Sequence, residues 1–106
     1  MNAAQFVGNW YDLKKEMLEA YMGDGGTTVV AGQIEAMGLS GEQRNQLRAV
    51  LDGVLRDTMY TLLLGLDGAA SIGRDQQRFT IVDEGGNAVG PIEEEAWKCF
   101  HGAATS

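Results

Sequence analysis

The sequence is poor in proline, cysteine and histidine, with one residue of each among 106. A lone cysteine excludes an intrachain disulfide framework. One cysteine and one histidine also exclude the usual zinc sites, which need several ligands of these two types. Because the chain has no low-complexity stretch that could serve as a linker, the sequence predicts a single compact domain over residues 1–106.

Positive charge is also scarce. Lysine and arginine total 8 against 15 aspartate and glutamate residues, which gives a net charge of −7. The basic residues are scattered along the chain, whereas a protein that binds nucleic acid or an anionic membrane surface needs a basic face. The charge therefore favours a protein partner with a basic surface.

Long hydrophobic runs are absent as well. The longest, Leu62–Leu66, is far shorter than a membrane span. The first residues of the sequence contain neither the basic nor the apolar region of a signal peptide. Together with the single cysteine, these features lead us to expect a cytoplasmic protein.

Apolar residues at helical spacing predict two helices in the first third of the chain. The first spans Asn2–Met22, where Asn2 and Gln5 form a capping-box pattern. A second, shorter helix is expected over Thr27–Met37, although the β-branched pair Val29–Val30 leaves a strand start open. The residues of the first helix expected to face the core are Phe6, Trp10, Leu13, Met17 and Tyr21, with Val7, Tyr11 and Leu18 widening that face.

The strongest helical pattern runs from Ser40 to Leu66 and begins with a second capping box, Ser40 to Gln43. From Met59 onward its polar face nearly vanishes, which is typical of a helix that is buried on several sides. We therefore expect Leu62–Leu66 to be the centre of the core, with Leu62 and Leu66 fully buried.

After residue 68 the pattern changes. Arg78–Asp83 alternates apolar and polar residues like a strand, Glu84–Asn87 is a turn signal, and Ala88–Val89 can return as a second strand. Pro91 suits the first position of a final helix, which Gly102 can end. The predicted fold class is α+β: mostly α-helical, about four helices, with a small antiparallel β-hairpin between the long central helix and the C-terminal helix.

Residues that could carry out catalysis do not form a recognisable set. Cys99 and His101 are two positions apart on one helix, so their side chains diverge by about 200°. The glycine-containing loop 65–75 lacks a phosphate-binding lysine and does not follow a strand. In that loop Asp67 and Ser71 are expected to satisfy exposed backbone groups. The sequence therefore predicts no catalytic residue, no metal ligand and no cofactor.

The remaining pattern is acidic. The stretch between Phe79 and Trp97 contains carboxylates and no lysine or arginine. Such residues suit a turn and a helix start, where negative charge is favourable. They equally suit a negative patch that meets a basic surface on a protein partner. The candidate binding residues are Asp83, Glu84, Glu93, Glu94 and Glu95.

In its small size, its acidity and its lack of a catalytic constellation, the chain resembles bacterial immunity proteins, which block a toxin made by the same or a rival cell. It is also similar, more loosely, to small acidic inhibitors of nucleases. The resemblance covers size and charge. It implies a non-enzymatic protein-binding module that neutralises a basic toxin or nuclease.

Two other classes of function stay open. One is a small enzyme or ligand-binding domain that uses the 65–75 loop, with Asp67, Ser71 and Asp75. The other is an adaptor or assembly subunit that dimerises through an aromatic helix face, for which Trp10, Tyr11 and Tyr21 are candidates. The sequence leaves both a monomer and a homodimer open.

Overall fold

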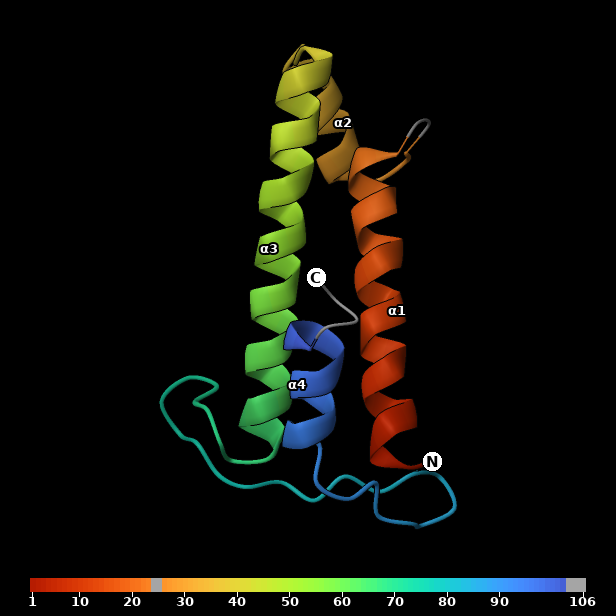
Figure 1. The fold of residues 1–106 in the computed structure, drawn as a ribbon, viewed down its shortest axis with the longest axis vertical. Helices are drawn as coiled ribbons and strands as arrows, with labels where there is room; N and C mark the ends of the chain where they lie inside the picture. The colour runs from red at the N-terminus through yellow and green to blue at the C-terminus, as the bar shows by residue number, and fades with distance from the viewer. Residues whose placement is uncertain (24–25, 103–106) are drawn as a thin grey trace.

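The computed structural model describes residues 1–23 and 26–102, which form four helices and no β-strand. Helices α1 and α3 are long and antiparallel (Figure 1). Helix α4 lies in front of this pair, where α1 begins and α3 ends, and α2 lies behind it at the other end. The molecule is elongated, with extents of 47 × 29 × 29 Å. The helices are α1 (Ala3–Met22), α2 (Val29–Ala36), α3 (Gly41–Leu66) and α4 (Glu93–His101).

Local hydrogen bonds fix where the helices start, as the sequence predicts. Asn2 and Gln5 exchange backbone-to-side-chain hydrogen bonds of 2.9 and 2.8 Å at the start of α1. Ser40 and Gln43 do the same at the start of α3, and the Thr28 hydroxyl caps α2. Both predicted capping boxes are therefore confirmed.

Helix α3 runs the length of the molecule, because 26 residues span about 39 Å. None of the helices in the described part of the chain is both long enough and apolar enough to cross a membrane.

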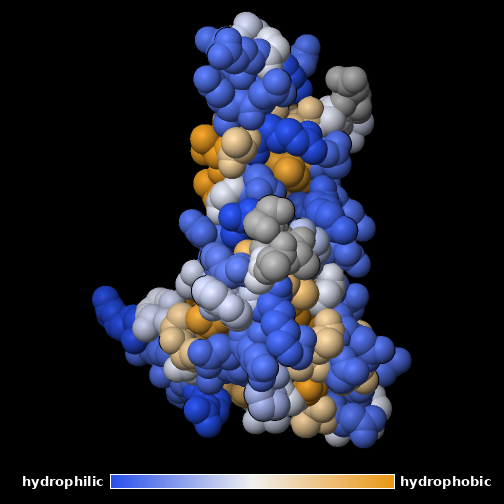
Figure 2. Space-filling model, in the orientation of Figure 1, coloured by the Kyte–Doolittle hydropathy of each residue, from blue (hydrophilic) through white to orange (hydrophobic). Residues whose placement is uncertain are grey.

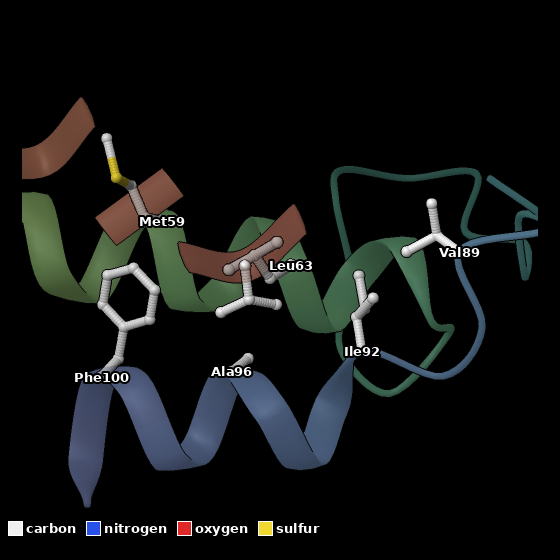
Figure 3. Close-up of a cluster of buried hydrophobic side chains, with 7 residues drawn as sticks. Met59, Leu63, Val89, Ile92, Ala96 and Phe100 are labelled. Carbon is white, nitrogen blue, oxygen red and sulfur yellow. The ribbon is translucent and has the colours of Figure 1, made fainter. Parts of the chain in front are cut away.

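One core lies where α4 packs against α1 and α3. Figure 3 shows Ala96 and Phe100 of α4, and Ile92 just before it, turned toward Met59 and Leu63 of α3. The Phe100 ring meets the Tyr11 ring of α1 edge-on, at 5.6 Å between centroids. The largest fully enclosed side chains of this core are Val7, Leu63, Ile92 and Phe100.

A second core lies at the opposite end, where α2 packs against α1 and α3. It is built on three buried side chains, Leu18, Met22 and Ile34. The surrounding residues of α3 belong to the row Leu47, Leu51 and Leu55, which contributes only half-buried leucines. Each core therefore forms where a short helix covers one side of the long pair.

The core includes Leu63, within the predicted range Leu62–Leu66, but the predicted full burial of Leu62 and Leu66 is wrong. Leu62 and Leu66 are only half-buried, whereas Leu63 is fully enclosed. The reason is that α1 and α4 cover α3 on one side, and Leu62 lies on another side. In α1, likewise, Val7 and Leu18 are buried while Leu13 stays 46% exposed.

The predicted β-hairpin, and with it the α+β fold class, is wrong. Residues 78–89 make a turn closed by one isolated bridge, between Val82 and Ala88. The backbone N–H of Phe79 donates to Leu66 at the end of α3, so the first arm pairs with a helix terminus. The second arm stops after Val89, because Gly90 has a φ of +91° and Pro91 has no N–H to donate.

Helix α4 begins at Glu93, two residues later than the predicted position of Pro91. Its first N–H groups are satisfied from outside the helix. One carboxylate oxygen of Asp67, at the end of α3, accepts hydrogen bonds from the N–H groups of Ile92 and Glu93, both at 2.7 Å. Asp67 therefore satisfies exposed backbone groups, as expected, and it fixes α4 to α3.

Candidate functional site

An apolar groove of about 450 Å³ runs between α1 and α3. We call the surface around it the open face, defined by Trp10, Leu13 and Met17 of α1 and Leu55, Thr58 and Leu62 of α3. The groove is lined by these six residues together with Asn9 and Met59. It is therefore built almost wholly from apolar side chains.

The open face and α4 lie on opposite sides of the helix pair. On α3, Tyr60 contacts α4, with ring centroids 6.3 Å from Trp97 and 4.4 Å from His101. Leu62 is two residues beyond Tyr60 and so points about 200° away from it. Figure 2 shows the α4 side, which is mostly hydrophilic, with apolar residues in small groups.

The open face begins where α2 stops. Leu55 packs against the core that α2 covers and also lines the groove. From there the groove continues along the same side of α3 to Leu62. Of the apolar surface along this side of the pair, α2 thus covers one part and leaves the rest in contact with solvent.

The sequence contains a signal for this face, a second apolar row on α1, which also fits a helix side buried in the core. Helix α1 has two apolar rows: one, with Val7 and Leu18, is buried, and the other, with Trp10, Leu13 and Met17, lines the groove. A helix packed on one side needs only one such stripe. When the apolar side of a helix is wider than its contact with one neighbouring helix, the extra width indicates a second contact surface.

Ion pairs join α1 and α3 along a neighbouring row. Lys14 is only 5% exposed, and its Nζ lies 2.7 Å from Asp52. Arg56 also pairs with Asp52, at 3.4 Å, and Arg48 pairs with Glu19. A buried lysine costs free energy unless it is paired, so Lys14 favours the arrangement that places it against Asp52. The pairs of Lys14 with Asp52 and of Arg48 with Glu19 therefore link the two walls of the groove, whereas the pair of Arg56 with Asp52 lies within α3.

The burial of Lys14 is not among the features predicted from the sequence. Lys14 stands seven residues after Val7 and four before Leu18, at a position where an apolar residue is expected. A charged residue inside an apolar row, with an aspartate at Asp52 on the facing helix, was the available signal.

Asp83, one of the five candidate acids, has a structural role. Its carboxylate accepts a hydrogen bond of 2.8 Å from the Met1 ammonium and two of 3.0 Å from the N–H groups of Gly85 and Asn87. The ammonium first, and then the backbone donors, hold the pKa of Asp83 below its ordinary value. Asp83 therefore ties the 83–87 turn to the start of α1.

The structure places the other four acids in two different segments. Glu84 is exposed in the 83–87 turn by the N-terminus of α1, while Glu93–Glu95 form the first turn of α4 beside the end of α3 (Figure 1). Glu94 and Glu95 each lie 3.5 Å from the Lys98 ammonium. Glu95 and then Glu94 raise the pKa of Lys98.

The 65–75 loop does not bring its three candidate residues together. Asp67 is engaged with α4, and a cavity of about 440 Å³ beside it is lined by neither Ser71 nor Asp75. The loop is fixed instead by Gln76, whose amide donates to the Gly65 carbonyl and accepts from the Ile72 N–H, both at 2.6 Å. Across residues 1–23 and 26–102, no three His, Cys, Asp or Glu side chains gather as a metal site.

Cys99 and His101 face different neighbours. Cys99 is half-buried and packs against the core around Leu63, whereas His101 is exposed and stacks on Trp97 at 5.1 Å. Burial, followed by Glu95 and Asp12, raises the pKa of the Cys99 thiol. The two side chains accordingly do not form a thiolate–imidazole pair.

We predict that Cys99 is alkylated more slowly in the native protein than in the unfolded chain at neutral pH. The thiolate is the reactive form, and a raised pKa lowers its fraction. The native rate should keep rising at alkaline pH values where the rate of the urea-unfolded chain has levelled off. Iodoacetamide labelling followed by mass spectrometry measures both rates. Native labelling faster than that of the unfolded chain would contradict this assignment.

Comparison of the chain with protein families, with curated proteins and with solved structures finds no match. The geometry itself therefore has to identify the site. Asp67, Asp83, Glu94 and Glu95 engage other parts of the chain, whereas the open face presents an apolar surface to solvent.

Proposed function

We propose that this protein is a non-enzymatic, protein-binding module whose contact surface is the open face. The observation that carries the proposal is the apolar groove of about 450 Å³ between two helices linked by ion pairs. Exposed contiguous apolar surface of this kind marks interaction sites in soluble proteins. A groove between helices typically receives the apolar side of another helix.

The placement of the charged residues supports a binding role rather than catalysis. Lys14 and Asp52 pair across the helices, Asp67 caps α4, and Asp83 holds the chain start. Each of these groups is engaged in holding the fold together. A cytoplasmic location fits a chain whose single cysteine, Cys99, can form no intrachain disulfide.

Within the protein-binding class, the open face favours an assembly subunit over an inhibitor that acts through its acidic residues. Trp10 lies on this face, and aromatic residues are enriched where partners bind most tightly. Among the acids, Asp83, Glu94 and Glu95 already have partners within the chain.

Site-specific photo-crosslinking in the cells that make the protein tests this proposal. Leu13 on the open face is replaced by p-benzoylphenylalanine, and Met37, which is 60% exposed at the end of α2, is replaced in a matched control. We expect a discrete covalent adduct from position 13 and none from position 37. Adding Thr58→Lys across the groove should abolish the adduct. Equal labelling at both positions, or an adduct that survives Thr58→Lys, would contradict the proposal.

A further inference from the structure

The folded chain exposes more surface than a compact monomer of its mass. Its accessible area is 6947 Å², whereas about 5,800 Å² is typical at 11.4 kDa. Its radius of gyration is 16.2 Å, against about 13 Å for a compact domain of this length. The surplus of about 1,100 Å² is spread over the whole chain, including the exposed stretch 68–88, and it exceeds the roughly 800 Å² that each partner contributes to a standard protein interface.

On α3 the charged residues lie away from the open face, whereas on α1 the exposed Glu16 lies at its edge, seven residues after Asn9. Between positions 48 and 62, α3 carries four charged residues. Three of them, Arg48, Asp52 and Arg56, form the row of ion pairs beside α1. The fourth, Asp57, is two residues past Leu55 and so points to the opposite side of the helix. Two copies of this acidic chain can therefore meet here without placing like charges together on α3.

On α3 the groove offers a basic helix no acid with which to pair. A basic partner would gain most where acids flank the groove, because charge complementarity steers and orients binding. On α3 the groove is bordered by Thr58 and continues into exposed Val54 and Val50, which are 53% and 59% exposed. These residues offer apolar contact and no charge.

The shape of the face suits a second copy. Two antiparallel ridges with a groove between them can receive the same two ridges turned by a two-fold axis, since such an interface uses one patch twice. Four long helices packed in this way form a bundle with crossing angles of about 20°. Trp10 and Leu13, which is 46% exposed, would then lie in its centre.

From these observations we infer that the open face is covered by a second copy of this chain, so that the protein is a two-fold symmetric dimer built on a four-helix layer of α1 and α3. This inference rests on the proposed function, because it names the partner of the same surface.

Sedimentation equilibrium of the purified full chain tests the inference, at concentrations up to about 100 µM, where a dimer with a micromolar Kd is almost fully formed. We expect twice the chain mass of 11.4 kDa for the natural sequence. Leu13→Lys and Thr58→Lys should each weaken the dimer by about tenfold or more, because a lysine would be buried at the centre of an apolar interface. Met37→Lys adds the same charge outside the face and should leave the dimer intact. Circular dichroism confirms that each variant is folded.

Three results would overturn the inference. The first is a natural chain that stays at 11.4 kDa over the whole range. The second is a Kd that stays unchanged in both Leu13→Lys and Thr58→Lys. The third is a dimer that Met37→Lys disrupts as strongly as they do. If the chain is monomeric but position 13 still crosslinks to a different protein in cells, the second copy is wrong and the proposed function stands. If neither occurs, both are wrong.

Discussion

Leu63→Ala is expected to lower the free energy of unfolding by about 2–5 kcal/mol, a large share of the total for a small domain. Leu63, on α3, is fully enclosed by residues of α1 and α4. Removing most of its side chain therefore leaves a cavity that the surrounding helices cannot fill. Urea unfolding followed by circular dichroism measures the loss, with the m-value showing whether the transition stays two-state.

Leu62→Ala is the matched control, because it removes the same atoms one residue away, on the open face. Leu62 is half-buried, so its loss should be about 1 kcal/mol. Both substitutions are made in a Leu13→Lys background, which keeps the open face unoccupied during the measurement. A larger loss at Leu62 than at Leu63 would restore the core that the sequence pattern predicts.

Asp67→Ala is expected to cost about 1–3 kcal/mol and to loosen α4 first. One carboxylate oxygen accepts two N–H groups at the start of this helix, at 2.7 Å each. Hydrogen bonds to a charged acceptor are stronger than those between neutral groups. Without them, the amide protons of Ile92 and Glu93 should exchange faster with solvent, which hydrogen exchange monitored by NMR reports residue by residue.

Two comparisons make the Asp67 result specific. Asp67→Asn keeps an acceptor oxygen without the charge and should lose less stability than Asp67→Ala. Asp75→Ala removes an exposed carboxylate from the same segment and should change little. Unchanged protection of Ile92 in Asp67→Ala would show that α4 is held by its apolar contacts alone.

The sequence predicted the helices well, because their starts depend on local chemistry. Asn2 with Gln5, and Ser40 with Gln43, satisfy backbone groups within three residues of one another. Nothing distant is needed to form these caps. The ends of α1, α2 and α3 accordingly lie within one or two residues of the predicted boundaries.

The predicted hairpin does not form, because alternating apolar and polar residues produce a strand only where another strand is available to pair with it. Phe79 and Val82 are 49% and 56% exposed, so the apolar residues of this segment do not line a common buried side. The N–H of Phe79 finds its acceptor at Leu66, a contact between segments that local pattern cannot foresee. The segment therefore forms one isolated bridge, between Val82 and Ala88, and not a strand.

The open face could not be predicted from the sequence, for a different reason. Hydrophobic spacing shows which residues share a side of a helix, but it does not tell whether that side is covered. Trp10 and Leu13 fit a core row as well as Val7 and Leu18 do. Only the positions of α2 and α4, which cover other parts of the pair, decide which row is buried.

The bond from Asp67 to the start of α4 also bears on how the segment between them can change. Residues 68–91 form a closed loop whose two ends are held together by one carboxylate. The entropy of closing a loop rises only slowly with its length, by about 0.6 kcal/mol for each doubling. The parts of this stretch that make no contact with the helices can therefore lengthen or shorten over evolutionary time at little thermodynamic cost, provided that the aspartate, the helix it holds and the contacts of Gln76, Phe79 and Val89 are kept.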